Sequence, residues 1–186
     1  HKMNVLTQVS FSQLKESEFL NEVSVLNFLK DLSNSEPAIV DSILKSLPLD
    51  SIVYAGNSMP IRYIELLKRE GLHYMASRGA NGIDGQIATA TGIAGHTSKE
   101  VHAIIGDLTF LYDGNFIFQV LPSNLTLHIL NNQGGRSFER VDVPQEMINP
   151  HKKDLAKIIE KLGRKNQFRI YAIDNEQTEK FWQRWK

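Results

Sequence analysis

The sequence predicts an α/β fold with a mostly parallel sheet and helices on both faces. Two observations lead to this prediction. Short apolar runs rich in β-branched residues recur along the chain, and segments with the apolar spacing of a helix separate them. Parallel strands need such crossovers, and their burial on both faces accounts for runs that are apolar throughout.

The expected elements alternate along the chain. Residues 1–35 are expected to form a polar entry segment and a packing helix, which carries Phe19, Val23, Leu26 and Leu29 at helical spacing. Residues 36–186 are expected to form the domain that follows. We expect its strands at 51–56, 73–77, 101–107, 125–132 and 167–174, and its helices at 37–47, 61–70, 84–95, 109–121, 152–163 and 176–186.

Composition excludes several classes of protein. The 186 residues carry 21 basic and 21 acidic side chains, so the net charge is zero and we expect no nucleic-acid partner. Apolar runs such as VHAII fall far short of the roughly 20 residues of a membrane-spanning helix, so we expect no span and a cytoplasmic location. Cysteine is absent, which leaves carboxylate, amide, carbonyl and histidine groups as ligands for any metal.

Asp107 and Asn132 each follow an expected strand. A helix over 109–121 would run back roughly 20 Å, and the strand over 125–131 would return about 23 Å, so the two residues should meet at one edge of the sheet. A carboxylate, an amide oxygen and a loop carbonyl suit Mg²⁺, and ligands of such sheets bind at the strand ends. The helix start near residue 109 would add N–H donors, and Gly134 and Gly135 would permit close backbone approach. These features favour a cradle for a metal and a diphosphate.

Simpler interpretations of these residues stay open. Asp107 can cap the following helix, and the NNQGG stretch can be an ordinary turn. A second acid–glycine pair, Asp113 with Gly114, falls in the middle of the expected helix with no strand before it. We therefore prefer Asp107. His102 and His128 lie within expected strands and are interpreted as structural.

Two further loops follow the first two expected strands. In RGANGIDG, three glycines precede a helix, Arg78 opens the stretch and Asp84 is placed to cap the helix. In NSMPIR, Ser58 stands at the expected N-cap and Arg62 lies one turn along the same face. Surface ion pairs would explain the two arginines equally well as bidentate recognition of carboxylates or phosphate.

These loops together resemble a known enzyme family. Gly-Asp followed after about 25 residues by Asn-Asn resembles the signature of thiamine-diphosphate enzymes. More narrowly, GNSMPIR, RGANGIDG, GDLTFLYD and NNQGG in this order resemble the C-terminal, diphosphate-binding domain of the 2-succinyl-5-enolpyruvyl-6-hydroxy-3-cyclohexene-1-carboxylate synthases. The similarity runs from about residue 35 to residue 138, and Leu108 after Asp107 is typical of this family.

The resemblance implies cofactors and roles for named residues. Thiamine diphosphate and Mg²⁺ would be the cofactors, with Ile83 as an apolar wedge beneath the thiazolium ring and Phe138 as an aromatic near the cofactor. Mg²⁺ would be held by Asp107, Asn132 and the Gly134 carbonyl. Substrates would contact Ser58, Arg62 and Arg78. The full set implied for the cofactor is Gly79, Gly82, Ile83, Gly106, Asp107, Leu108, Asn132, Gly135 and Phe138.

The resemblance also implies a reaction and partners. Enzymes of this family decarboxylate 2-oxoglutarate and add the resulting carbanion to isochorismate in menaquinone biosynthesis. In these enzymes a glutamate on the pyrimidine-binding domain, which generally comes from a neighbouring subunit, takes part in forming the thiamine ylide. This chain lacks that domain, so we expect it to be a fragment that is inactive alone. We expect the full-length protein to be a homodimer or homotetramer.

Two departures affect these expectations. Gln133 stands where the family more often has Asn, and the segment after Phe138 is shorter than the family's substrate-covering stretch. Two alternatives stay open: another thiamine-diphosphate decarboxylase or carboligase, and a noncatalytic diphosphate-binding module.

Overall fold

The computed structural model describes residues 27–77, 82–115, 119–140, 143–144, 148–161, 163 and 165–185. Within these residues, five parallel strands form one sheet in the order β2-β1-β3-β4-β5. The prediction of a parallel sheet is therefore confirmed. The strands are β1 (Ile52–Ala55), β2 (His73–Ala76), β3 (Val101–Gly106), β4 (Leu125–Asn131) and β5 (Phe168–Ala172).

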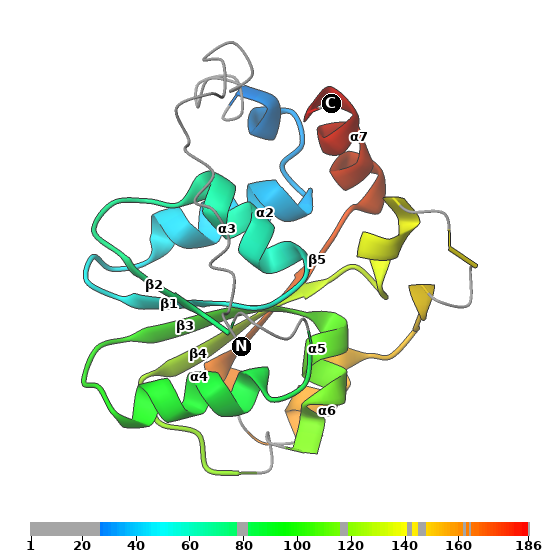
Figure 1. Cartoon of the computed structure of the whole chain (residues 1–186). Helices are drawn as coiled ribbons and strands as arrows, with labels where there is room; N and C mark the ends of the chain where they lie inside the picture. Colours follow the sequence, from blue (N-terminus) through cyan, green and yellow to red (C-terminus); the bar gives the residue numbers. More distant parts are fainter. Residues whose placement is uncertain are drawn as a thin grey trace, which may run out of the picture.

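Helices cover both faces of the sheet, as expected (Figure 1). One layer consists of α2 (Glu36–Ser46), α3 (Met59–Leu67) and α7 (Asn175–Trp185). The opposite layer consists of α4 (Gln86–Gly95), α5 (Asp107–Tyr112) and α6 (Leu155–Lys161).

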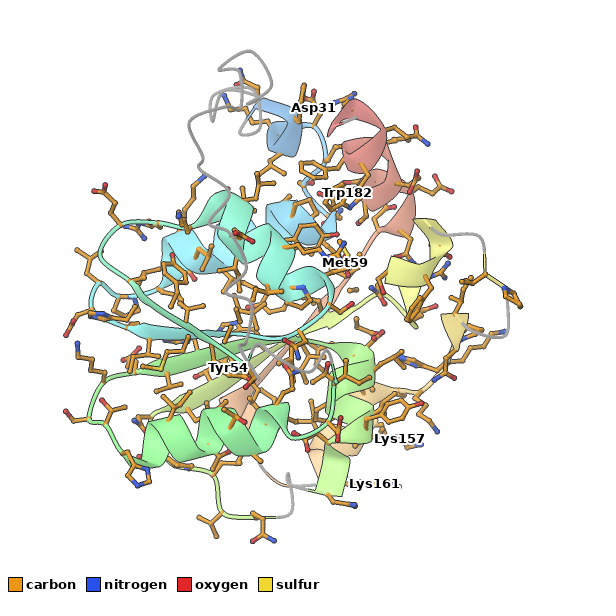
Figure 2. The ribbon with its side chains drawn as sticks, viewed as in Figure 1. Asp31, Tyr54, Met59, Lys157, Lys161 and Trp182 are labelled. Carbon is orange, nitrogen blue, oxygen red and sulfur yellow. The ribbon has the colours of Figure 1, made fainter. Side chains whose placement is uncertain are left out.

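Side chains that alternate along each strand divide the core in two. In β1, Val53 joins the apolar cluster beneath α2 and α3, whereas Tyr54 joins the cluster beneath α4 (Figure 2). Strands buried on both faces explain why their sequences are apolar without alternation. A third, smaller apolar cluster lies where the first described residues meet α7. In it Leu29, Leu32 and Ala38 pack with Phe181.

The strand order places a topological switch point at one edge of the sheet. Strands β1 and β3 are neighbours, but the chain leaves β1 into α3 on one face and leaves β3 into α5 on the other. Ligands of open α/β sheets bind at such a switch point, outside the carboxyl ends of the strands. Gly56–Ser58 follow β1 and Asp107 follows β3, so the fold directs both segments to that edge.

The helix expected over 109–121 is wrong in length. Helix α5 covers only Asp107–Tyr112, with Asp113 as its C-cap, and residues 116–118 lie outside the described residues. Asp113 is therefore not in the middle of a helix. The expected meeting of Asp107 and Asn132 still holds for another reason, because β3 and β4 are adjacent parallel strands whose residues Gly106 and Leu130 are in register.

His102 and His128 lie in β3 and β4 and are buried. Hydrogen bonds run from Tyr171 to His128 (2.9 Å), from there to His102 (3.2 Å), and on to Glu100 (3.3 Å). Leu130 contacts the α2 and α3 side of the core, so His128, two residues earlier, faces the same side. This arrangement agrees with a structural role for both histidines.

The packing helix expected in residues 1–35 falls largely outside the described residues, which include only its helical end at 27–30. The boundary at residue 35 stays a prediction, although Ser35 does act as the N-cap of α2. In the part of the chain that the structure describes, no helix combines the length and the apolar character needed to cross a membrane.

Candidate functional site

Asp107 lies at the carboxyl end of β3 and is 2% exposed. Its Oδ1 accepts a hydrogen bond from the N–H of Leu108 at 2.6 Å. Its Oδ2 accepts from the N–H groups of Gln133 at 2.7 Å and Gly134 at 3.1 Å. The loop after β4 is thus hydrogen-bonded to the residue that directly follows β3, which brings together the two segments predicted to share a ligand.

Asn132 contributes an amide oxygen to the same point. Its Oδ1 accepts from the Gly134 N–H at 3.2 Å, the same N–H that Asp107 Oδ2 contacts. The backbone of Gly134 has φ +147°, and a Cβ there would lie 3.0 Å from Pro150 Cα, so only glycine fits without strain. The carboxylate and amide oxygens therefore converge on a loop whose shape depends on glycine.

The backbone of residues 148–150 approaches Gly134 and Gly135 closely. Gly135 donates its N–H to the Ile148 carbonyl, and a Cβ on Gly135 would lie 2.8 Å from that oxygen. The segment that begins at Ile148 thus packs onto the loop after β4. The glycines do permit close backbone approach, as expected, but the observed neighbour is protein.

His151 is a part of the site that sequence reasoning missed. Its Nε2 lies 3.1 Å from Asp107 Oδ2, and its side chain is 8% exposed. Its N–H donates to the Gln133 carbonyl at 3.1 Å. A single histidine after an Asn-Pro pair carries no pattern that would have identified it.

Glu36 was missed as well. This buried residue opens α2, and its Oε1 accepts from Asn132 Nδ2 at 2.6 Å while its Oε2 accepts from the Tyr63 hydroxyl at 2.7 Å. An acidic residue in the first turn of a helix usually faces solvent and stabilises the helix dipole. The sequence therefore gave no sign that it would reach Asn132, which is 96 positions away.

A cavity of about 80 Å³ lies over these residues. Its lining includes the apolar side chains of Ile83, Leu108 and Phe138 beside the polar groups at the strand ends. Phe138 is 49% exposed, which leaves an aromatic face at the rim. The lining residues are Glu36, Asn57, Ser58, Met59, Pro60, Ile83, Gly106, Asp107, Leu108, Thr109, Asn132, Gly134, Gly135, Arg136, Ser137 and Phe138.

The pKa of the Asp107 carboxyl departs from its ordinary value. Burial raises the pKa of the Asp107 carboxyl, although the facing His151 and the backbone N–H groups of Leu108, Gln133 and Gly134 act in the opposite direction. A divalent cation would offset this cost of burying the charged form. Among the described residues no three His, Cys, Asp or Glu side chains gather as a metal site, so amide and carbonyl oxygens would complete the ligand set.

Several predicted site residues do line the cavity. They are Ser58, Ile83, Gly106, Asp107, Leu108, Asn132, Gly134, Gly135 and Phe138. Two others do not: Arg62 is exposed on α3 outside the lining, and Gly82 instead accepts hydrogen bonds at its carbonyl from Asn57 and Gln86. Arg78 and Gly79 lie outside the described residues.

Ser58 stands at the N-cap position of α3, as predicted, but its side chain makes no capping hydrogen bond. Its backbone has φ 73° and ψ −121°, a conformation that non-glycine residues rarely adopt. The helix therefore does not use the Ser58 side chain, and Ser58 is an exposed residue in the lining of the cavity. For the same reason Ser58 and Arg62 are not related by a regular helical turn.

The prediction that Asp84 caps α4 is wrong. The N-cap is Gly85 in a left-handed conformation, and no side chain at the cap satisfies the first turn. Asp113 does this from a distance, accepting from the N–H groups of Gly85 at 3.1 Å and Ile87 at 2.6 Å. The end of α5 thus positions the start of α4, next to Ile83.

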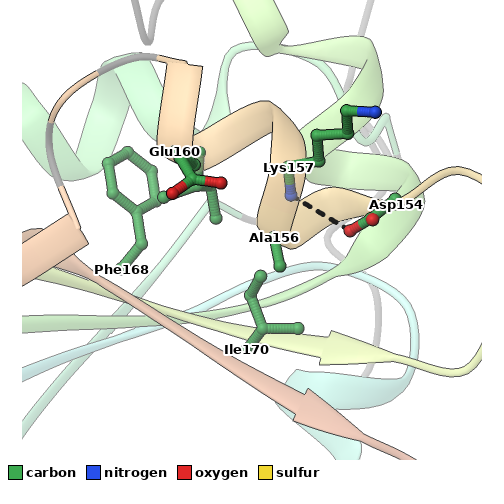
Figure 3. Close-up of a pocket in the computed structure, with 7 residues that line it drawn as sticks. Asp154, Ala156, Lys157, Glu160, Phe168 and Ile170 are labelled. Atoms are coloured by element: carbon green, nitrogen blue, oxygen red, sulfur yellow. Dashed lines mark hydrogen bonds between the residues drawn. The ribbon is translucent and has the colours of Figure 1, made fainter.

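A second pocket, of about 490 Å³, lies between α6 and β5 (Figure 3). Asp154, Lys157 and Glu160 are on its helical side, and Phe168 and Ile170 on its strand side. None of the groups around Asp107 contributes to it, so the candidate site is the smaller cavity at the strand ends.

No family model matches the chain, but curated relatives do. The 2-succinyl-5-enolpyruvyl-6-hydroxy-3-cyclohexene-1-carboxylate synthase of Desulfotalea psychrophila is 39% identical over 139 residues, 70% of this chain and 26% of the relative. Proteins of the same name from Lysinibacillus sphaericus and Psychromonas ingrahamii are 33% and 31% identical over 81% and 89% of this chain, and each is matched over 28% of its length. The chain thus spans little more than a quarter of the length of these relatives.

Proposed function

This chain belongs to the family of 2-succinyl-5-enolpyruvyl-6-hydroxy-3-cyclohexene-1-carboxylate synthases, and we propose that it forms the metal- and diphosphate-binding part of such an enzyme. The proposed cofactors are thiamine diphosphate and Mg²⁺. The proposed reaction decarboxylates 2-oxoglutarate and adds the resulting carbanion to isochorismate, as a step of menaquinone biosynthesis.

One observation carries the proposal. Asp107 Oδ2 and Asn132 Oδ1 both accept from the N–H of Gly134, at 3.1 Å and 3.2 Å, at adjacent strand ends. Two hard oxygens and the carbonyl of the same glycine are the kind of ligand set that Mg²⁺ prefers, with further positions for phosphate oxygens and water. These residues therefore fit a magnesium–diphosphate group chemically.

The size of the cavity supports only part of a cofactor site. At about 80 Å³ it falls well below the 300–1,000 Å³ of pockets that enclose a whole small ligand. A bound cofactor would place its diphosphate end here and its pyrimidine end against another surface. We propose that this surface is the pyrimidine-binding domain of a neighbouring subunit in a homodimer or homotetramer, which also provides the glutamate.

Residues around the cavity have proposed roles toward the cofactor and substrates. Ile83 and Phe138 offer apolar surface beside the metal ligands, suited to a thiazolium ring. Ser58 presents its hydroxyl at the cavity, suited to a polar substrate group. Arg62 and Arg78 are proposed to bind carboxylates of the two anionic substrates, which for Arg62 requires its exposed side chain to turn toward the cavity.

The cofactor and the residues of this chain have different proposed roles in the reaction. Thiamine diphosphate, when bound, supplies the electron sink for decarboxylation and for transfer of the carbanion. The residues of this chain hold the metal, orient the diphosphate and shield one side of the reacting centre from water.

The full-length protein provides the test. Turnover with 2-oxoglutarate, isochorismate, thiamine diphosphate and Mg²⁺ is expected for the full-length protein and not for residues 1–186 alone. Use of pyruvate without isochorismate would point instead to another decarboxylase or carboligase. Binding of thiamine diphosphate without any carboligation would point to a noncatalytic module.

A further inference from the structure

We propose that Glu36 is a positioning residue for the metal, because it fixes the amide of Asn132 with Oδ1 toward Asp107. The inference rests on the proposed function, since it concerns the same site. It assigns a role to a residue that is not among the proposed ligands of the metal or the diphosphate.

The orientation of the Asn132 amide follows from its two neighbours. The Gly134 N–H is a donor and contacts Oδ1 at 3.2 Å, and the Glu36 carboxylate is an acceptor and contacts Nδ2 at 2.6 Å. Reversing the amide would set Nδ2 against the N–H and Oδ1 against the carboxylate. Both hydrogen bonds would be lost, so Glu36 specifies which end of the amide reaches the metal position.

Glu36 can do this because the structure holds it rigidly. The residue is 3% exposed, and its Oε2 accepts from the Tyr63 hydroxyl at 2.7 Å. Its N–H donates to Thr178 Oγ1 at 3.0 Å. A buried carboxylate needs such partners, and they leave Oε1 directed at Asn132.

The contacts extend from this pair to the C-terminal helix. Trp182 lies on α7 (Figure 2). Its Nε1 donates to the Tyr63 hydroxyl at 3.2 Å. Asn175 at the start of α7 donates from Nδ2 to the Asn132 carbonyl at 3.0 Å. Helices α2, α3 and α7 thus share one polar network, buried at Glu36 and Tyr63 and part-buried at α7, that includes a proposed metal ligand.

A purely structural role is the competing explanation. Removing a buried carboxylate from a helix interface lowers stability whether or not a metal is bound nearby. The two explanations differ in what happens to metal affinity in protein that is still folded. They also differ in which substitutions restore it, because positioning depends on reach and acceptor geometry.

The experiment measures Mn²⁺ affinity by electron paramagnetic resonance for the full-length protein with saturating thiamine diphosphate, together with its unfolding temperature. We expect Glu36→Ala to weaken Mn²⁺ binding by about 10- to 100-fold, as is typical when a partner of a ligand is removed. Glu36→Gln keeps an acceptor at the same reach and is expected to stay within a few-fold of wild type. Glu36→Asp keeps the charge but draws it back by one methylene, and is expected to lose affinity.

Asn124→Ala is the matched control. Asn124 directly precedes Leu125, where β4 begins, at the opposite end of the strand from Asn132. Its amide donates to three carbonyls, those of Ala94, Thr97 and Lys99. Its replacement is expected to lower the unfolding temperature with Mn²⁺ affinity unchanged. Should Glu36→Ala fail to fold, the contrast between Glu36→Gln and Glu36→Asp carries the same test.

Two outcomes would overturn the inference in distinguishable ways. If wild type binds Mn²⁺ and the Ala and Asp variants of Glu36 bind it equally well when folded, the positioning role is wrong and the proposed function stands. If wild type itself binds no Mn²⁺ in the presence of thiamine diphosphate, both the proposed function and the role of Glu36 are wrong.

Discussion

His151 donates a hydrogen bond from Nε2 to Oδ2 of Asp107 across 3.1 Å. The backbone N–H of Lys153 donates a hydrogen bond to the other ring nitrogen, Nδ1, at 3.2 Å. Because Nδ1 is an acceptor, Nε2 carries the ring proton. Metal ligands commonly depend on such outer partners for their orientation. Asp107 and Asn132, the proposed metal ligands, each have one such partner, because His151 contacts Asp107 and Glu36 accepts a hydrogen bond from the Asn132 amide.

Substitution of His151 should therefore affect the metal without removing a ligand. We predict that His151→Ala weakens Mg²⁺ binding to the full-length protein by about 10- to 100-fold, and that His151→Gln, whose amide retains a donor, loses less. Titration calorimetry with thiamine diphosphate present measures both. His96→Ala, on the exposed end of α4, is the control, and equal affinity in His151→Ala and wild type would refute the role.

Asp113 should stabilise α4 although it lies in a different element. Because its carboxylate accepts from the N–H groups of Gly85 and Ile87, we predict that Asp113→Ala lowers the free energy of unfolding by about 1–2 kcal/mol. Asp84→Ala should change it by less than about 0.5 kcal/mol, because Asp84 makes no capping bond. Urea unfolding of the two variants compares them, and the reverse order would restore Asp84 as the cap.

Gly134 should resist substitution where another glycine tolerates it. At φ +147°, with Pro150 Cα 3.0 Å from an added Cβ, Gly134→Ala is predicted to cost about 1–3 kcal/mol of stability. Gly92 lies inside α4 with nothing within 4 Å of an added Cβ. Gly92→Ala should therefore raise stability by about 0.5–1 kcal/mol. Thermal unfolding measures the stability of both variants. Equal changes in stability for Gly134→Ala and Gly92→Ala would contradict the argument from the Gly134 backbone.

His128 should make stability depend on pH. Burial, followed by the charges of His102 and Arg169, lowers the pKa of His128 from 6.5 to about 3. The unfolded chain therefore takes up a proton before the folded protein does, and stability that is complete above pH 6.5 declines as the pH falls toward 3. The slope from this group is at most about 1.4 kcal/mol per pH unit.

The His128→Gln variant isolates that contribution. We predict a flatter decline of the unfolding free energy between pH 6.5 and pH 4 than in wild type, because Gln does not titrate. Denaturant unfolding at a series of pH values measures it. Parallel curves for the two proteins would show that His128 does not carry the dependence.

The sequence predicts the layers of this fold better than its loops. Strands buried on both faces and the helices between them leave a strong apolar pattern, so the parallel sheet and its two helical layers were predictable. The helix over 109–121 was not, because its apolar residues continue beyond Asp113 although that carboxylate is used to cap α4. Single-sequence periodicity has no access to such a distant partner.

The same limit applies to the site. That Asp107, Asn132 and Gly134 lie together was predictable, because strand ends of a parallel sheet meet at one edge. The contacts of Glu36 and His151 with them were not predictable, because these side chains reach Asn132 and Asp107 from positions 96 and 44 residues away in the sequence. Such partners are fixed by tertiary packing and leave no local pattern.

The most direct test of the account is calorimetric titration of the full-length protein with thiamine diphosphate, with and without Mg²⁺, in wild type and Asp107→Ala. Wild type should bind the cofactor tightly only when Mg²⁺ is present. Asp107→Ala should lose that Mg²⁺-dependent binding while keeping its fold, as circular dichroism would verify. Unchanged Mg²⁺-dependent binding in Asp107→Ala would contradict the assignment of the metal site to this edge of the sheet.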